Sequence, residues 1–211
     1  MACTLLDIQN TVADLIGTGD GSTAVPKRDR LINQARRKFY SEKQWSFLRT
    51  DATSVSLTSQ VGDLPATYNI KFDPIAVYSY TDNSKYSYSK VAWDDLVQYG
   101  TGDYVYAIDK VSRHIKVSQS VASITLDYTY LPTDKSVDTV GNADPEAADD
   151  ITPIALLATA MWYLSSRQAS GKYQLFKDEY DKELNQWKIA DAGSQPIKFF
   201  SRKGWNNFGY R

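Results

Sequence analysis

The chain has 211 residues, with 24 lysines and arginines, 25 aspartates and glutamates, and a formal net charge of −1 at pH 7. This length suffices for one large or two small domains without stabilising disulfides or metals. The balanced charge gives no bulk attraction to nucleic acid or to an anionic membrane surface. Cys3, the only cysteine, has no internal disulfide partner, and the N-terminus does not resemble a signal peptide, so we expect folding inside a cell.

Residues 1–49 predict two amphipathic helices with a cap residue at Thr4 and a start at Pro26. Their apolar stripes are Leu5, Ile8, Val12 and Leu15, then Leu31, Ile32, Ala35 and Phe39. The glycine-rich run at 17–22 between them lacks the Gly-Lys-Ser/Thr ending of a phosphate loop and follows no strand. We therefore expect it to be a flexible connection.

The other side of the second helix is basic. It carries Lys27, Arg28, Arg30, Arg36, Arg37 and Lys38, and Lys43 follows. Such a stripe is what contact with phosphates requires, yet a solvated or subunit-facing surface has the same composition. Both interpretations stay open for Arg30, Arg36, Arg37 and Lys38, which are the candidate contact residues of this helix.

Residues 50–133 predict a β-rich insertion, because the hydrophobic period changes from 3.6 to 2 and Thr, Ser, Val and Tyr dominate. Gly62 and Asp63 are expected to form a turn, and the segment 93–99 a short helix or loop. Two hairpins are predicted, around 82–83 and 110–113, before a last strand at 124–130. In the first hairpin Tyr78 and Tyr80 are expected to face Tyr86 and Tyr88. These four tyrosines either pack across strands or form a surface for sugars or another subunit.

The segment 134–149 holds several acids without the spacing of a calcium loop, so we interpret it as a solvated acidic loop. Thr152 and Pro153 then open an apolar helix, with Thr152 as its cap. Its apolar residues recur at helical spacing as far as Leu164 and others fill the opposite face, so we expect the helix to be buried all round. This apolar run is shorter than the roughly 20 residues of a membrane span. A second, amphipathic helix follows Gly171 and completes a helical hairpin ending near residue 190.

Residues 191–211 form a C-terminal tail of a different character, with aromatic and basic side chains and no acid after Asp191. The candidate docking residues are Phe199, Phe200, Arg202, Lys203, Trp205, Phe208 and Tyr210. Aromatic residues and arginine are common anchors of interfaces. The tail is expected to be ordered by another chain, with folding back over its own domain as the alternative.

Groups suited to catalysis are few. His114, the only histidine, lies in a predicted hairpin without a nearby cysteine or a serine motif, and one histidine with one distant cysteine cannot make a zinc site. We therefore expect no enzyme activity, no catalytic or metal-binding residue and no cofactor. The predicted fold class is α+β, with a bundle of N- and C-terminal helices (1–49 and 150–190), an inserted antiparallel β-rich region and an extended tail.

In this order, several segments resemble the head-to-tail adaptor (connector) proteins of tailed bacteriophages, particularly the kind related to tail tubular protein A. They are RLINQARRKFYSEKQWSF (30–47), TYNIKFDPIAVYSY (67–80), YVYAIDKVSRHIKV (104–117), ITLDYTYLP (124–132) and DDITPIALLATAMWYLSSR (149–167). The resemblance is one of order and pattern over most of residues 5–190.

The resemblance implies a structural virion protein of the neck, assembled in the host cytoplasm, that forms a ring of about twelve copies between portal and tail. Its implied partners are copies of itself, the portal protein and a tail or nozzle protein. Genomic DNA would pass through the ring without sequence-specific contact, and no membrane is involved. In that setting the tail is a candidate for portal docking. The alternative function is a carbohydrate- or partner-binding module that uses the tyrosine-rich sheet face.

Overall fold

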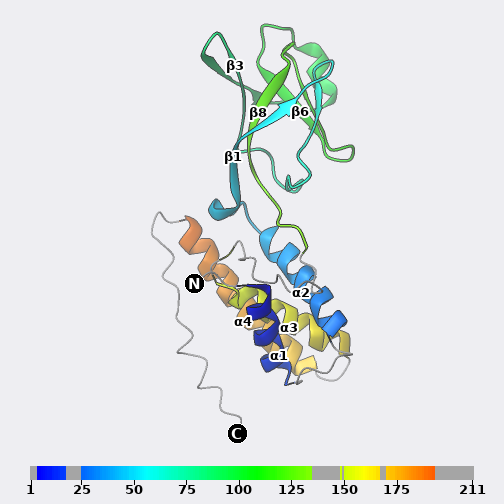
Figure 1. Ribbon diagram of the computed structural model, residues 1–211, viewed down its shortest axis with the longest axis vertical. Helices are drawn as coiled ribbons and strands as arrows, with labels where there is room; N and C mark the ends of the chain where they lie inside the picture. Colours follow the sequence, from blue (N-terminus) through cyan, green and yellow to red (C-terminus); the bar gives the residue numbers. More distant parts are fainter. Residues whose placement is uncertain (1–3, 18–24, 135–147, 149, 167–169, 193–211) are drawn as a thin grey trace. The chain divides into compact units, whose positions relative to one another are not determined.

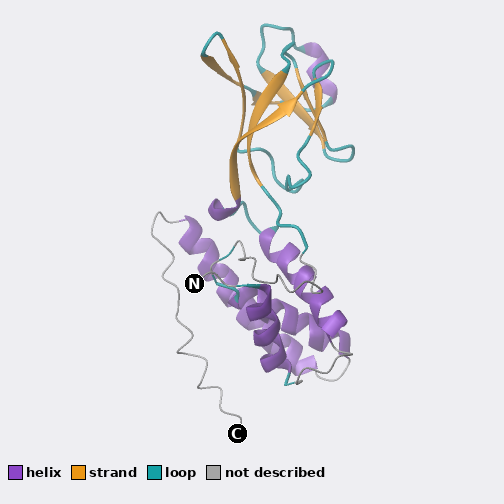
Figure 2. Ribbon diagram, in the orientation of Figure 1, coloured by secondary structure: helices purple, strands orange, loops and turns teal. Residues whose placement is uncertain are grey.

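The computed structural model describes residues 4–17, 25–134, 148, 150–166 and 170–192. In these residues it contains four α-helices and two four-stranded sheets, which confirms the predicted α+β class. The chain divides into two compact units (Figures 1 and 2). The helical unit comprises residues 1–39 and 134–211, and the β unit comprises residues 40–133.

The helices are α1 (Leu5–Ile16), α2 (Val25–Tyr40), α3 (Thr152–Ser166) and α4 (Ser170–Ala192). Helix α1 begins as predicted at Thr4, whose hydroxyl accepts the Asp7 N–H while the Asp7 carboxylate accepts the Thr4 N–H. This reciprocal pair satisfies two otherwise unpaired donors. The helix ends at Gly17, whose left-handed conformation (φ 68°) costs glycine no steric strain.

Helix α3 is the buried helix of the unit, as its composition predicts, and residues 153–160 are all buried. The predicted burial of the helix all round is wrong at Leu164, which is 61% exposed. Its cap is Asp150 rather than Thr152: the Asp150 Oδ1 accepts both the N–H (2.9 Å) and the hydroxyl (2.7 Å) of Thr152. Among the described helices, none combines the length and hydropathy needed to cross a bilayer.

Side-chain contacts join the four helices. Phe39 of α2 meets Trp187 of α4 edge to face with 5.5 Å between ring centroids, and Tyr163 of α3 stacks on Phe176 of α4 at 5.7 Å. Buried Gln9 of α1 donates a 2.9 Å hydrogen bond to buried Asp29 of α2. This bond satisfies polar groups that would otherwise be costly to bury, and it fixes α2 against α1.

The β unit begins with a 3₁₀ turn, η1 (Ser46–Leu48), and contains a second one, η2 (Asp94–Gln98). Its strands are β1 (Arg49–Ser56), β2 (Val61–Asp63), β3 (Ala76–Thr81), β4 (Ser84–Ser87), β5 (Ser89–Lys90), β6 (Val105–Asp109), β7 (His114–Val117) and β8 (Ser123–Thr129). The sheets have the orders β1-β8-β3-β4 and β2-β7-β6-β5. One core cluster, which includes Ile115, Ile124 and Leu126, draws on both sheets.

The predicted turn at Gly62 and Asp63 is wrong, because both residues lie in β2. The turn is at Ser59 and Gln60, which both have positive φ (51° and 69°). Thr58 and Val61 exchange backbone hydrogen bonds across it. The glycine is needed instead for close packing, since a Cβ on Gly62 would lie 2.6 Å from the carbonyl oxygen of Ser56.

Both predicted hairpins are present, but the register of the first differs from the prediction. β3 and β4 are joined by Asp82 and Asn83, whose positive φ values (50° and 63°) suit a type I′ turn. With a two-residue loop Thr81 pairs with Ser84, so Tyr78 pairs with Ser87 and Tyr80 with Lys85. Because side chains alternate between faces, Tyr78 and Tyr80 lie on the opposite face from Tyr86. The predicted facing of the two tyrosine pairs is therefore wrong.

Candidate functional site

The basic side of α2 is smaller than its sequence predicts. Arg30, Arg37 and Lys38 are exposed, but Arg36 is only 2% exposed and donates a 3.0 Å hydrogen bond to Asn33. Arg36 follows buried Ile32 by four residues, which places it on the buried side of the helix. The predicted exposure of Arg36 is therefore wrong, and this residue lies on the buried side of α2.

The charge of Arg37 is also compensated. Its guanidinium holds Asp134 through two bonds, from Nε to Oδ1 at 2.7 Å and from Nη2 to Oδ2. The hydrogen bond and the charge of Asp134 raise the pKa of Arg37. A bidentate pair of this kind is well oriented but exposed, so its contribution to stability is small. Of the four candidate residues, Arg30 and Lys38 are exposed and lie outside this ion pair.

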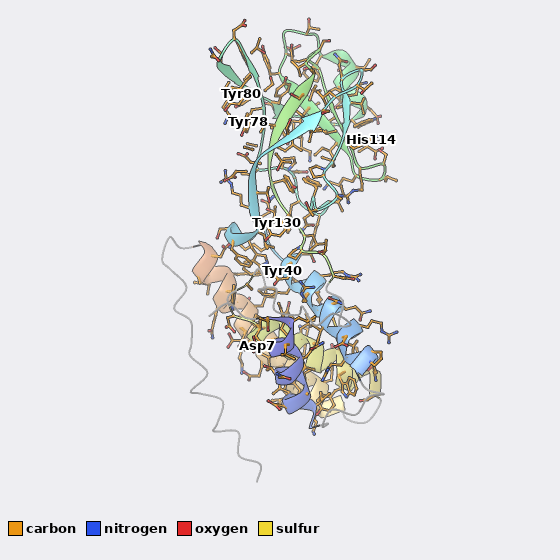
Figure 3. All side chains as sticks on the ribbon, in the orientation of Figure 1. Asp7, Tyr40, Tyr78, Tyr80, His114 and Tyr130 are labelled. Atoms are coloured by element: carbon orange, nitrogen blue, oxygen red, sulfur yellow. The ribbon has the colours of Figure 1, made fainter. Side chains whose placement is uncertain are left out.

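The tyrosines predicted to form one sheet face are divided between two environments. Tyr80 is 62% exposed and meets the ring of buried Tyr78 edge to face, with 5.7 Å between centroids. Lys85 places its Nζ 3.6 Å from the centroid of the Tyr78 ring. Tyr78 and Tyr80, labelled in Figure 3, therefore share one polar, partly exposed face of the β3–β4 hairpin with Lys85.

The other two tyrosines belong to the interior side. Tyr86 stacks on Tyr104 at 4.8 Å, and Tyr88 is buried in the main core. The Tyr88 hydroxyl lies 3.1 Å from Ser79 Oγ, which satisfies its polar end. These contacts show that Tyr86 and Tyr88 serve packing within the β unit.

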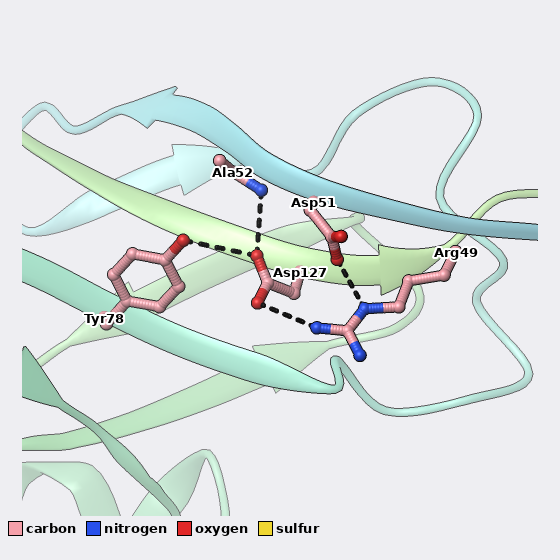
Figure 4. A network of polar contacts seen from close by, with 5 residues as sticks. All are labelled: Arg49, Asp51, Ala52, Tyr78 and Asp127. Carbon is pink, nitrogen blue, oxygen red and sulfur yellow. Dashed lines mark hydrogen bonds and ion pairs between the residues drawn. The ribbon is translucent and has the colours of Figure 1, made fainter. Parts of the chain in front are cut away.

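A polar network beneath Tyr78 is centred on Asp127 of β8 (Figure 4). The Asp127 carboxylate accepts hydrogen bonds from the backbone N–H of Ala52 (2.8 Å), the Tyr78 hydroxyl (3.3 Å) and Arg49 (3.4 Å). Arg49 also pairs with Asp51. Ala52 is aimed at the carboxylate by a β-bulge between Thr50 and Thr53 and has a positive φ of 55°.

This network has a clear electrostatic effect. Burial, followed by the charge of Asp127 and its hydrogen bond, raises the pKa of Tyr78. A buried carboxylate needs several donors, and β1 and β3 supply them here. The network thus joins three strands, while the exposed rim around it is formed by Tyr80, Lys85, Arg49 and Asp51. The signal in the sequence was the charged residue, Asp127, within the apolar alternation of residues 124–130.

His114, labelled in Figure 3, lies on β7 between two aspartates on adjacent strands. Asp63 of β2 and Asp109 of β6 are its direct cross-strand partners, and His114 Nε2 lies 3.1 Å from Asp63 Oδ1. Within the described ranges, no three or more His, Cys, Asp or Glu side chains gather where they could hold a metal ion. The geometry around His114 is that of a contact between neighbouring strands at the surface of the β unit.

The seven predicted docking residues of the tail, Phe199 to Tyr210, lie outside the described residues, as does most of the acidic loop. The described candidates therefore lie on two separate surfaces. One is the reduced basic side of α2, and the other is the face of the β unit that carries Tyr78, Tyr80 and Lys85, which we call the Tyr80 face.

Comparison with models of known protein families gives a match over residues 4–198 to the SU10 adaptor protein family. The chain therefore belongs to this family. The match confirms the predicted resemblance to the head-to-tail adaptors of tailed bacteriophages and identifies a phage adaptor protein, a structural component of the virion. No curated protein matches the chain.

Proposed function

We propose that this protein assembles as a closed ring, of about twelve copies, between the portal and the tail of a bacteriophage. The ring extends the channel through which DNA leaves the head and provides the attachment site for the tail. The observation that carries this proposal is the family match over residues 4–198, together with the two-unit α+β architecture. Assembly takes place in the host cytoplasm, and the mature position is the neck of the virion.

Self-association is supported by the balanced charge of the whole chain and by the surface of the helical unit. A net charge of −1 lets copies pack without strong repulsion. Single apolar side chains are exposed on three of its helices: Leu6 on α1, Leu164 on α3, and Leu175 and Ile189 on α4. Leu175 and Ile189 are fourteen residues apart, close to four helical turns, and so lie on a similar side of α4. In a heterologous contact, each copy binds the next through two different surfaces. Such contacts close into a ring when the rotation between neighbouring copies is a whole fraction of 360°.

The partners follow from this arrangement. The tail segment 191–211, with four basic residues and no acid after Asp191, is proposed to dock on the portal. The exposed Arg30 and Lys38 of α2 are proposed to face either a neighbouring copy or DNA in the channel. The Tyr80 face of the β unit is proposed to contact another virion protein.

The direct test is sedimentation of the purified chain with and without the portal oligomer from the same phage, followed by imaging of the complex. A stoichiometric ring stacked on the portal is the expected result. Failure to associate at several salt concentrations contradicts the proposal. The chain alone is not informative here, because a protein that assembles only on its partner sediments as a monomer.

The portal-docking role of the tail has its own test. Deleting residues 195–211 is expected to leave both units folded, with the thermal unfolding temperature within about 2 °C of the full chain. The same deletion is expected to abolish cosedimentation with the portal. A lowered unfolding temperature would instead assign the tail to the core of the helical unit.

The alternative of a carbohydrate-binding module has less support. A sugar-binding platform needs several exposed aromatic rings, and of the four tyrosines Tyr78 and Tyr88 are buried while Tyr86 is stacked on Tyr104. Only Tyr80 of this set is largely exposed. The face is better suited to contact with a protein, through one aromatic ring and a rim of mixed charge.

A further inference from the structure

Three apolar side chains are exposed within seven residues around η2. Trp93 is 37%, Val97 85% and Tyr99 40% exposed. Single exposed apolar residues are normal on protein surfaces, whereas a concentration of large ones marks a contact site. We call Trp93, Val97 and Tyr99 the η2 patch. The sequence indicated only a short helix or loop at this position.

The segment that carries the patch is firmly held. Leu96, at the centre of η2, is buried against Val105 and Ala107 of β6 in a small cluster separate from the main core. Figure 2 shows η2 as a short helix beside the strands of the β unit. Because Tyr106 belongs to the main core, Val105 and Ala107 must use the opposite face of the sheet. The patch is thus presented by a helix anchored on the outer face of β6.

Further bonds hold the loop that follows η2. The Gly100 N–H donates to the Asp103 carboxylate at 3.1 Å. Beyond the end of β7, the hydroxyl of Ser118 and the side-chain amide of Gln119 donate to the Asp103 carbonyl. A contact surface that is already ordered loses less conformational entropy on binding. The backbone that carries the patch is therefore anchored on both sides of its centre rather than part of a loose loop.

The charge beside the patch indicates what can cover it. Asp94 and Asp95 are exposed, and neither has an ion-pair partner among the described residues; Asp95 only accepts a 3.5 Å bond from Gln98. A partner that covers the patch removes water from these carboxylates, which is costly unless it supplies cations. The complementary surface is therefore apolar at its centre, with lysine or arginine at its rim.

A second copy of this chain offers two basic surfaces in its described part. The basic side of α2 carries none of the large exposed apolar side chains of the described residues, so it could neutralise Asp94 and Asp95 but could not bury Trp93 and Val97. Helix α4 combines exposed Leu175 with exposed Lys172, but that surface is already proposed for the contact between neighbouring copies in the ring. The occupant is therefore sought in another protein.

We propose that the η2 patch is the surface on which the tail docks, through an apolar depression rimmed by lysine or arginine on the adjoining tail protein. This inference rests on the proposed adaptor function and identifies the residues that would perform its tail-binding step. Trp93 and Val97 are the anchors, while Asp94 and Asp95 select the partner by charge.

The experiment uses DNA-filled heads from a phage lacking the adaptor gene, to which purified adaptor and then purified tails of the same phage are added. Adaptor bound per head and tails attached per head are counted separately by electron microscopy. The Val97→Ser and Trp93→Ser/Val97→Ser variants are expected to bind heads normally and to attach tails at least about tenfold less well. Val111→Ser is the matched control, because Val111 is 95% exposed in the β6–β7 turn of the same unit.

A charge variant provides an independent readout. Asp94→Asn/Asp95→Asn is expected to slow tail attachment several-fold at low salt, with the difference disappearing at high salt, because exposed charges mainly steer association. The single Val97→Ser variant keeps the test valid if loss of Trp93 disturbs η2. Unfolding of each variant is measured in parallel.

The other outcomes either overturn the inference or assign the patch to a different partner. Wild-type attachment of tails by both patch variants overturns the inference. Loss of head binding in the patch variants, but not in Val111→Ser, assigns the patch to a second copy or to the portal. Binding of a synthetic 193–211 peptide to a chain ending at Ala192, lost in the double variant, assigns it to the C-terminal segment. Failure of the wild-type chain to bind heads contradicts the proposed function itself.

Discussion

At the scale of single residues, the β unit depends on positions whose role is steric or electrostatic. Gly62 brings β2 against β1 at the point where the chain passes from one sheet to the other. Its missing side chain is what permits this approach, since a Cβ would also lie 2.8 Å from Leu57 Cδ2 and from Val55 Cγ1. Asp127, Ala52 and Tyr78 show the electrostatic counterpart, in which a buried carboxylate is satisfied by donors from two other strands.

Replacing Gly62 with alanine is expected to destabilise the β unit by about 1–3 kcal/mol, because backbone as well as side-chain atoms must move to admit the methyl group. The free energy of unfolding from urea titration measures the effect. Gly102→Ala is the control, since nothing lies within 4 Å of its added Cβ and its stability is expected to change little. Equal stability of the two variants would contradict the close-packing role of Gly62.

Alkaline pH is expected to weaken the core of the β unit through Tyr106. Burial, assisted by the charge of Asp73, raises the pKa of Tyr106 to about 12, while an unfolded tyrosine ionises near pH 10. A raised pKa means that the folded state favours the neutral form of the Tyr106 side chain over the ionised form. Its stabilisation is complete below pH 10 and is lost as the pH rises from about 10 to about 12.

Tyr106→Phe is expected to reduce this alkaline loss by roughly 1 kcal/mol at pH 11. Guanidinium unfolding at several pH values between 8 and 11.5, compared with the wild type, measures the difference. Burial also raises the pKa of Tyr68 and Tyr88, so a smaller dependence on pH remains in the variant. Superimposable pH profiles would show that Tyr106 is not the group responsible.

At the scale of elements, caps and loop lengths explain where the sequence was informative. The cap at Thr4 and the buried run of α3 were predictable, because both depend on residues close together in the chain. The hairpin at Asp82 and Asn83 was predictable for the same reason. Its register followed from the same two-residue loop, since 81 must pair with 84. The prediction that the two tyrosine pairs face each other was wrong because it matched residues of the same type and did not count positions from the two-residue turn.

The start of α3 offers a test of capping. Asp150→Ala is expected to destabilise the helical unit by about 1 kcal/mol. The Asp150 carboxylate accepts the N–H of Thr152, and its negative charge interacts favourably with the positive end of the helix dipole. Thr152→Ala is expected to cost less, since its hydroxyl only donates to Asp150. Thermal unfolding of both variants gives the comparison. A larger effect at Thr152 would restore the prediction made from sequence.

At the scale of the whole molecule, the β unit is inserted between α2 and α3. The Arg37–Asp134 ion pair lies just outside both junctions and brings together two points of the helical unit that are 97 residues apart in sequence. The two segments that connect the units therefore leave the helical unit at neighbouring positions. The β unit has its own core, built from residues between Val55 and Tyr128.

We therefore propose that the β unit folds alone. A fragment of residues 40–133 is expected to give a dispersed amide spectrum by nuclear magnetic resonance and a cooperative thermal transition. Gly62→Ala in the same fragment should lower the transition temperature, which ties the transition to the native packing. A collapsed spectrum without a transition would show that the β unit needs the helices to fold.

The sequence by itself determined the types of element, the burial of α3, the cap of α1, the two β hairpins and the family resemblance. Each depends on a local period, a short motif or the order of segments. Only the tertiary structure decided that Arg36 is buried, that Arg37 pairs with Asp134, and that Asp127 joins three strands beneath Tyr78. Those outcomes depend on which distant residues come into contact. The sequence does not distinguish a charged side chain that faces water from one that contacts a buried partner. The η2 patch belongs to this second group, because its exposure depends on how Leu96 anchors the helix to β6.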